Sequence, residues 1–142
     1  MSETSYTQFE QVLHYFRQMD LVFLDLILDE HRTYQSMHRK KFLSMLGTVF
    51  QIFKNKGNTQ LLVYPGTCAI ETCSGCLPDM VGYCFVGEAT PHYLAMIFEV
   101  KDGRVLDMFE CTDMQHEHAV PGKQYRIRID PIIFSQDESE DV

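Results

Sequence analysis

The sequence predicts an α+β domain in which N-terminal helices pack on an antiparallel sheet, in the order α-α-β-α-β-β-β-β-β. Apolar residues recur at helical spacing up to Gly57, and beyond it short runs of β-branched and aromatic residues alternate with turn signals. A chain of 142 residues, 45% of them hydrophobic, is large enough for one domain with its own core. We expect residues 1–134 to form this single domain.

Two helices are expected in the first part of the chain. Phe9, Val12, Leu13 and Phe16 recur every three or four residues, which is typical of one face of an amphipathic helix. Asp20 is suited to cap a second, shorter helix over residues 21–28, because its carboxylate can accept hydrogen bonds from the N–H groups of the first turn.

A longer helix is expected over residues 37–56, after a short strand at residues 33–35. Ser36 is a favoured N-cap residue, and Gly57 readily adopts the left-handed conformation that ends a helix. The apolar face that should pack on the sheet consists of Phe42, Met45, Leu46, Val49 and Phe53.

The second part of the chain predicts strands. Each combines β-branched and aromatic residues between turn signals, and together they cover residues 59–64, 82–87, 92–100, 105–111 and 124–130. Asp102-Gly103 predicts a two-residue hairpin turn, because both residues tolerate positive φ. In the last strand, Tyr125, Ile127 and Ile129 fall on one side and charged residues on the other.

Three segments of the helical half carry a family resemblance. They are the acidic second helix Leu-Asp-Leu-Ile-Leu-Asp at residues 24–29, then Tyr34, then residues 36–46, which open on Ser36 and contain a Phe-Leu pair. With the order of elements, this pattern resembles the nuclear transport factor-two-like cone fold, which includes ketosteroid isomerase and the SnoaL-like polyketide cyclases. The resemblance covers residues 9–111 and implies a curved, cone-like sheet whose inner face often lines a ligand cavity. Because members of this fold have very different activities, the resemblance implies architecture rather than function.

The Asp102-Gly103 turn also predicts how its two strands pair. A two-residue turn gives the pairs Val100–Val105, Phe98–Asp107, Met96–Phe109 and Leu94–Cys111. Seven of these eight side chains are apolar, so we expect them to face the core with Asp107 among them. A buried carboxylate is costly unless it is hydrogen-bonded, ion-paired, protonated or facing a wet pocket. Asp107 is therefore a candidate general base or ligand-orienting acid, whereas a one-residue bulge would turn it outward to water.

The residues expected to line such a pocket are apolar or aromatic. Tyrosines can offer a hydroxyl to a ligand, although most buried tyrosines are core aromatics that reach the surface. The candidates for ligand contact are Tyr15, Tyr34, Met96, Phe98 and Phe109.

Four of the five cysteines lie close together, at Cys68, Cys73, Cys76 and Cys84. Four thiolates are enough for one tetrahedral zinc, and His92 could replace one of them. The spacing is not that of a zinc ribbon, and a cysteine inside a strand is commonly a small buried hydrophobe. The cluster thus leaves three interpretations open, namely a zinc site, a redox pair or structural thiols.

Charge and composition exclude some classes of function. The net charge of −8 argues against a nucleic-acid-binding protein, which would carry a basic surface. Residues 135–142 hold four acidic residues and one apolar residue, which predicts a disordered acidic tail. The chain shows no signal peptide and no apolar run long enough to span a membrane, and its odd number of cysteines argues against a fully disulfide-paired framework. We expect a cytoplasmic protein.

Three functional hypotheses follow. The first is a domain that binds a small apolar ligand or a protein partner, in the cavity or on the sheet of a cone-like fold, and forms a homodimer through that sheet. The second is an isomerase or cyclase with Asp107 as general base and a tyrosine that donates to a developing oxyanion. The third is an interaction module stabilised by zinc at the cysteine cluster. Binding ranks above catalysis, because no polar partner of Asp107 can be placed from the sequence.

Overall fold

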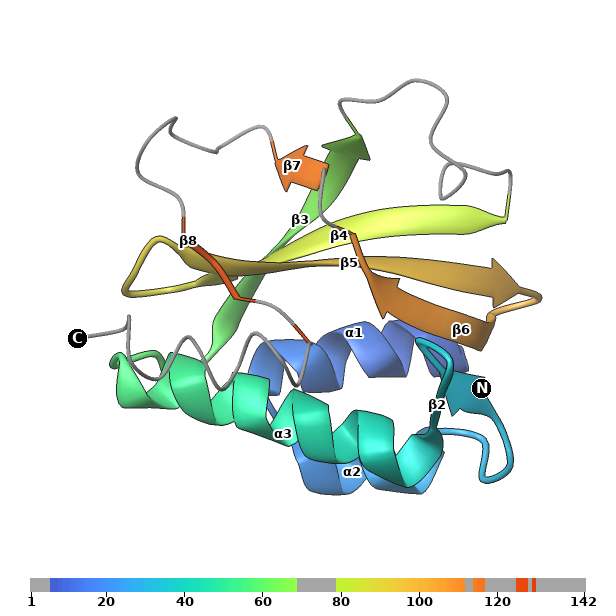
Figure 1. Ribbon diagram of the computed structural model, residues 1–142. Helices are drawn as coiled ribbons and strands as arrows, with labels where there is room; N and C mark the ends of the chain where they lie inside the picture. The colour runs from blue at the N-terminus through green and yellow to red at the C-terminus, as the bar shows by residue number, and fades with distance from the viewer. Residues whose placement is uncertain (1–5, 69–78, 112–113, 117–124, 128, 130–142) are drawn as a thin grey trace.

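The computed structural model describes residues 6–68, 79–111, 114–116, 125–127 and 129. As predicted, the chain is an α+β domain with its helices N-terminal to most of its strands. The helices form one layer, which lies against one face of a twisted antiparallel sheet (Figure 1).

The first two helices begin at side chains that cap them. Helix α1, Gln8–Gln18, starts at a capping box in which Thr7 and Glu10 bond each other's backbone N–H. Helix α2, Leu21–Ile27, starts at Asp20, whose carboxylate accepts a hydrogen bond from the Phe23 N–H at 3.2 Å. The predicted cap at Asp20 is confirmed.

The predicted start of the long helix at Ser36 is wrong. Strands β1, Thr33–Tyr34, and β2, Met37–His38, form a small hairpin, and its two turn residues, Gln35 and Ser36, have φ angles of 51° and 60°. Ser36 is used in this turn, so helix α3, Arg39–Asn55, is capped by His38. The helix ends just before Gly57, which has a φ of 101°, so the predicted role of Gly57 is confirmed.

The main sheet has the strand order β6-β5-β4-β3-β7, and neighbours along this path are antiparallel. Its strands are β3 (Leu61–Cys68), β4 (Met80–Gly87), β5 (His92–Lys101), β6 (Arg104–Glu110) and β7 (Met114–His116). Strand β8, Tyr125–Arg126, is shorter than the predicted strand over 124–130 and pairs with β5 in the parallel direction.

The β5–β6 hairpin follows its predicted turn but not its predicted register. Asp102 and Gly103 both have positive φ, and Val100 pairs with Val105 as expected. A β-bulge then places Leu106 as an extra residue, so that Glu99 pairs with Asp107. The three predicted pairs beyond the bulge are wrong, because one extra residue shifts every later side chain on β6 to the other face.

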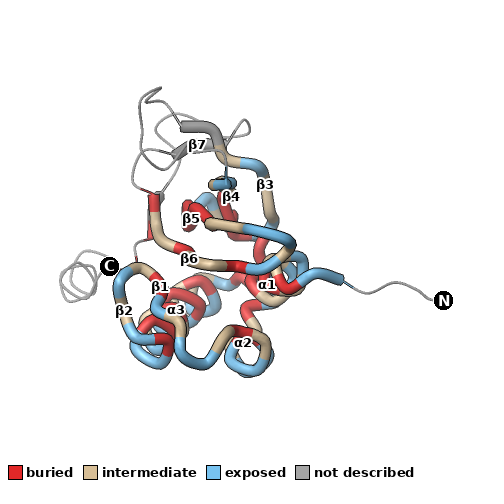
Figure 2. The backbone as a smooth tube through the Cα atoms, turned by 90° about the vertical axis from the view of Figure 1, so that its right-hand side faces the viewer, coloured by how far each residue is buried: buried red, intermediate tan, exposed pale blue. Residues whose placement is uncertain are grey.

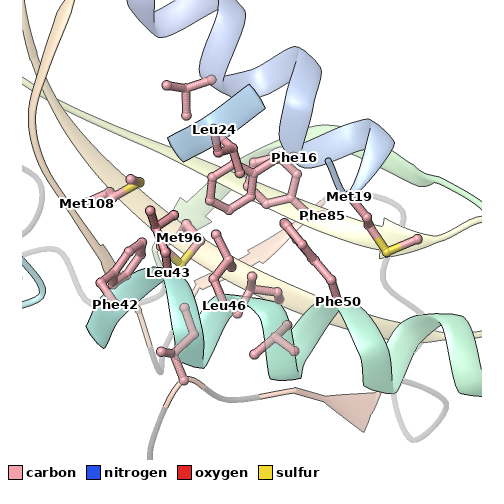
Figure 3. Close-up of a cluster of buried hydrophobic side chains, with 14 of the residues drawn as sticks. Phe16, Met19, Leu24, Phe42, Leu43, Leu46, Phe50, Phe85, Met96 and Met108 are labelled. Atoms are coloured by element: carbon pink, nitrogen blue, oxygen red, sulfur yellow. The ribbon is translucent and has the colours of Figure 1, made fainter. Parts of the chain in front are cut away.

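The main core lies between the helices and the sheet (Figure 3). Residues from every layer are completely buried there, among them Phe16, Phe42, Phe85, Phe98, Leu46 and Met96. Of the predicted α3 face, Phe42, Leu46, Val49 and Phe53 are buried and Met45 is partly buried, and the face also includes Leu43 and Phe50. In the described part of the chain, large side chains fill the space between helices and sheet.

The opposite face of the sheet is also apolar and buried. Its cluster consists of Cys84, Val86, Tyr93, Ala95, Ile97 and Cys111, each less than a tenth exposed. A sheet buried on both faces explains why strands β4 and β5 read as almost continuous apolar runs. Both faces of these central strands are thus buried.

Candidate functional site

The surface of helix α2 is the least expected feature of the described chain. Its sequence, Leu-Val-Phe-Leu-Asp-Leu-Ile, has one polar residue, and a helix that is apolar all round is normally buried. Only one side of α2 is buried, through Leu24 and Leu28. The other side exposes Val22 (70%), Phe23 (46%) and Leu26 (71%), three residues that we call the α2 face.

The α2 face lies at the periphery of the molecule. In Figure 2, α2 is at the lower edge of the backbone tube, far from the central strands, and exposed residues mark its outer side. Phe23 also stacks on Tyr15 of α1, with ring centroids 5.1 Å apart and planes 12° apart, which extends the aromatic surface toward α1. Exposed apolar patches of this kind mark contact sites on water-soluble proteins.

A groove of about 400 Å³ lies beside the α2 face, between α2 and α3. It is lined by Leu21, Val22 and Asp25 of α2 and by Lys40, Leu43 and Ser44 of α3. Its walls are apolar except for the Ser44 hydroxyl and one charge of each sign, the carboxylate of Asp25 on α2 and the ammonium of Lys40 on α3. We call it the α2–α3 groove.

An ion pair between Asp25 and Arg39 joins α2 to α3 beside this groove. The Arg39 guanidinium donates to the backbone carbonyl of Asp25 at 3.1 Å and forms an ion pair with its carboxylate. Arg39 is only 8% exposed, whereas the Asp25 side chain stays 56% exposed. Lys40 is exposed and has no ion-pair partner among the described residues. The groove thus keeps an accessible charge on each wall.

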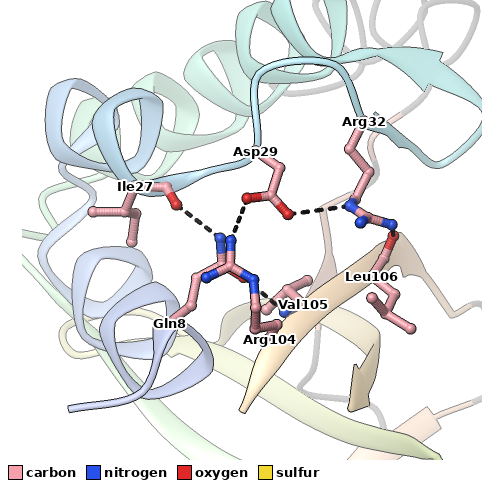
Figure 4. Close-up of polar contacts among 7 residues, drawn as sticks. All are labelled: Gln8, Ile27, Asp29, Arg32, Arg104, Val105 and Leu106. Atoms are coloured by element: carbon pink, nitrogen blue, oxygen red, sulfur yellow. Dashed lines mark hydrogen bonds and ion pairs between the residues drawn. The ribbon is translucent and has the colours of Figure 1, made fainter. Parts of the chain in front are cut away.

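Gln8 ties the end of α2 to the sheet. Its side-chain amide donates to the carbonyl of Ile27 at 2.8 Å and accepts from the N–H of Val105 at 2.8 Å (Figure 4). Gln8 is buried, so both groups would otherwise lack a partner away from water. One side chain therefore joins α1, α2 and β6.

A charged cluster completes this attachment. Asp29 forms ion pairs with Arg32 and with Arg104 of β6, and Arg32 also donates to the carbonyl of Leu106 at 3.3 Å (Figure 4). Leu106 is the extra residue of the β-bulge, so Arg32 donates to the backbone at the point where the β5–β6 ladder is irregular. The end of α2 and the segment after it are therefore joined to α1 and β6 by several hydrogen bonds and ion pairs.

Gln35, at the tip of the β1–β2 hairpin, closes the rest of the β6 edge. Its side chain accepts from the N–H of Glu110 at 2.9 Å and donates to the carbonyl of Ile129 at 2.9 Å. Gln8, Arg32 and Gln35 thus form hydrogen bonds with backbone groups along β6 that face away from β5. An edge covered in this way is protected from pairing with another strand.

Asp107, the candidate general base, lies on this same edge. Its carboxylate accepts hydrogen bonds from the N–H of Gln35 at 3.1 Å and from the N–H of Met108 at 2.8 Å. Asp107 is half-buried and lies opposite Glu99, not opposite Phe98 as the predicted register required. The Asp107 carboxylate thus helps to hold the β1–β2 hairpin against β6, and its predicted pairing with Phe98 is wrong. Its role as a general base stays a prediction.

Tyr34 is the most buried of the candidate ligand-binding tyrosines. It is completely buried, its ring lies 5.8 Å from that of Phe42, and its hydroxyl makes no hydrogen bond in the described structure. Burial raises the pKa of the Tyr34 phenol above its usual value of 10.0, and the Asp29 carboxylate raises it further. The nearby Asp29 N–H and the guanidiniums of Arg32 and Arg39 partly offset this rise in pKa.

The structure does not bring the other candidate ligand contacts together at one site. Met96 and Phe98 are completely buried in the main core, between helices and sheet. Phe109 packs on the opposite face of the sheet, because the bulge turns it away from Met96. Tyr15 is half-buried on α1, where it stacks on Phe23 beside the α2 face.

The cysteine cluster lies mostly outside the described residues. Cys73 and Cys76 are not described, and Cys68 is described only as the backbone end of β3, opposite Met114. Cys84 is completely buried on β4, where it pairs with Ala95. Within the described residues, no three His, Cys, Asp or Glu side chains are grouped as metal ligands would be. The zinc hypothesis stays a prediction.

Among the described residues, no helix has both the length and the hydrophobicity needed to cross a membrane. No family model, no curated protein and no solved structure matches the chain. The likeness to the cone fold therefore stays a prediction from the sequence pattern.

Reasoning from the sequence identified α2 but missed its exposed face. The signal was present, because residues 21–28 contain only one polar residue and so leave no polar side for solvent. The role of Gln35 had no such signal, because its partners, Glu110 and Ile129, are distant in sequence.

Proposed function

We propose that this chain is a protein-binding domain whose contact surface is the α2 face together with the α2–α3 groove. The observation that carries the proposal is the exposure of Val22 and Leu26, which are 70% and 71% exposed on a helix whose end is hydrogen-bonded to Gln8. Keeping large apolar side chains in water forgoes roughly 1.5–3 kcal/mol each relative to burial. A bound partner would recover that energy.

Two other surfaces of the described residues, the β6 edge and the faces of the central strands, are already covered, which supports this choice. The β6 edge is occupied by Gln8, Arg32 and Gln35, which leaves few backbone groups there for an added strand. Both faces of the central strands are buried. The α2 face is by contrast apolar, exposed and beside a groove.

The shape of the site favours a helical segment as the ligand. A groove between two helices accepts the apolar side of an amphipathic helix, whose anchors recur every three or four residues. Lys40 adds a preference for an acidic residue at the edge of that helix, because it carries a positive charge with no ion-pair partner among the described residues. The partner is thus an amphipathic helix with an acidic margin.

The test uses a labelled model peptide, an amphipathic helix with leucines on one side and glutamates along its margin. We expect fluorescence anisotropy to show micromolar binding to the intact chain. Leu26→Lys should weaken binding at least tenfold, because it places a charge in the apolar contact. Tyr6→Gln changes a side chain of matched exposure, 68%, that belongs neither to the α2 face nor to the α2–α3 groove, and it should leave binding unchanged. The proposal would be contradicted if the peptide did not bind, or if Leu26→Lys left its affinity unchanged.

A further inference from the structure

The α2–α3 groove carries its two accessible charges on opposite walls. Asp25 belongs to α2 and Lys40 to α3, and the rest of the lining is Ser44 and the apolar Leu21, Val22 and Leu43. The Asp25 carboxylate pairs with Arg39 within the chain and is still 56% exposed, so it can also meet a cation of a partner. Such a surface has one charge of each sign beside apolar side chains. When a second copy is rotated by 180° about a two-fold axis, its positive charge faces the negative charge of the first copy. Two copies of such a surface can therefore match each other in charge and in hydrophobicity.

Helix α2 is also a suitable ligand for this groove. It is a short helix of seven residues with exposed apolar side chains at Val22, Phe23 and Leu26, and it has Asp25 on its margin. These are the features that the groove selects, namely apolar anchors and an acidic residue for Lys40. The chain thus presents both the groove and a helix that fits it.

We propose that the partner is a second copy of this chain, and this inference rests on the proposed function of the α2 face. The two copies meet around a two-fold axis, with α2 of each copy in the α2–α3 groove of the other. Val22 and Leu26 lie at the centre of the interface. Asp25 of each copy faces Lys40 of the other, so the contact contains two symmetry-related ion pairs.

The size of the surface sets the expected strength of this dimer. A stable interface buries about 800 Å² on each partner, whereas α2 is only about 10 Å long. The contact is therefore smaller than that of an obligate dimer. A reversible dimer with a micromolar dissociation constant is expected.

Sedimentation equilibrium of the full chain, from about 1 µM to about 1 mM, tests this arrangement. The wild-type chain should pass from monomer to dimer over this range. Val22→Glu and Leu26→Lys should each raise the dissociation constant at least tenfold. The new glutamate lies near the N-terminus of α2 and the new lysine near its C-terminus, where each charge is favourable to the helix dipole. Both variants should therefore stay folded, which circular dichroism can verify. Tyr6→Gln is the control of matched exposure that adds no charge, and it should leave the dimer unchanged.

Lys40→Glu tests the ion pairs of the two-fold arrangement. It places a second carboxylate opposite the Asp25 carboxylate of the other copy, so the dimer should weaken at low salt. Near 1 M salt most of this loss should disappear, because exposed charges are then screened within about 3 Å. The loss caused by Val22→Glu comes largely from lost apolar contact and should persist. A dissociation constant that Lys40→Glu leaves unchanged would overturn the charge-paired arrangement.

Two outcomes separate this inference from the proposed function. If the chain stays monomeric throughout, the second copy is excluded. Binding of the model peptide, blocked by Leu26→Lys, would then leave the proposed function standing with a different partner. If the chain dimerises but neither α2 variant weakens the dimer, another surface is responsible and the inference is overturned.

Discussion

At the scale of single residues, Tyr34 combines complete burial with a hydroxyl that makes no hydrogen bond in the described structure. A buried hydroxyl without a well-aligned partner loses its hydrogen bonds to water and recovers little in return, which costs roughly 1–3 kcal/mol. The aromatic ring next to Phe42 is the part of Tyr34 that stabilises the fold.

Tyr34→Phe removes the hydroxyl and keeps the ring. We expect it to raise the free energy of unfolding by about 1 kcal/mol, measured by urea denaturation at neutral pH. Above pH 10.0 the difference in unfolding free energy between Tyr34→Phe and the wild type should grow. The pKa of Tyr34 is raised in the folded chain, so the unfolded state releases its proton first and the wild type loses stability as the pH rises. Tyr34→Ala should destabilise, and a destabilising Tyr34→Phe would contradict the argument.

Glu88 illustrates the opposite shift at an exposed position. The Thr59 hydroxyl, and then the Thr59 N–H, lower the pKa of Glu88 below its usual value of 4.5, with Gln60 adding to the effect. The stability that the Glu88 carboxylate contributes is present above pH 4.5 and is lost as the pH falls toward the lower folded pKa.

Glu88→Gln keeps the shape of the side chain but removes its charge. We expect it to lower the melting temperature at neutral pH, since hydrogen bonds to a charged acceptor are the stronger ones. The difference from the wild type should shrink below pH 4.5, where the wild-type carboxylate also becomes protonated. Thermal denaturation followed over a pH series measures this, and a difference that does not vary with pH would contradict the prediction.

At the scale of elements, the β1–β2 hairpin is held in an unfavourable conformation by its partners. Gln35 and Ser36 both have positive φ, which residues with a side chain adopt only at a cost of roughly 1–2 kcal/mol each. Gln35 offsets its share through hydrogen bonds to Asp107, Glu110 and Ile129. The Ser36 side chain makes no such hydrogen bond within the described structure.

Ser36→Gly should therefore stabilise the chain. Glycine adopts a φ of 60° without strain, so we expect the free energy of unfolding to rise by up to about 1 kcal/mol, after the greater entropy of glycine in the unfolded state is included. Thr33→Gly, in the adjoining strand, is the control and should destabilise, because it has no positive φ to relieve. Chemical denaturation of both variants compares them.

Elements with a local cause could be predicted from the sequence. The cap at Asp20, the stop at Gly57 and the turn at Asp102-Gly103 each depend on the conformation of one or two residues, and all three are confirmed. The register of β6 could not be predicted. The bulge at Leu106 is stabilised by Arg32, a residue distant in sequence, and no local pattern indicates that contact.

In the candidate site, too, local features could be predicted from the sequence, whereas features that depend on distant contacts could not. The apolar composition of residues 21–28 was visible in the sequence, but the position of Lys40 opposite Asp25 depends on how α2 and α3 pack. The predicted pairing of Asp107 with Phe98 is wrong for a related reason, while the role of Asp107 as general base stays a prediction. The pairing relied on an uninterrupted ladder, and a single extra residue reversed the face on which every later β6 side chain lies.

At the scale of the whole molecule, net charge opposes the association that the α2 face favours. The chain carries a net charge of −8, and copies of like charge repel each other at low salt. Four of the acidic residues lie in residues 135–142, outside the described part of the chain, so a chain without them would carry −4. The predicted acidic tail therefore accounts for half of the net charge.

Deletion of residues 136–142 separates folding from association. Because this segment has one apolar residue, we expect its removal to leave the melting temperature unchanged within about 1 °C. The dimer should become tighter at low salt, because the repulsion between copies falls with their net charge, and sedimentation equilibrium would detect the change. Near 1 M salt the truncated and full chains should associate equally, since charges more than about 3 Å apart are then screened. A drop of several degrees in the melting temperature would instead show that the tail docks on the folded domain.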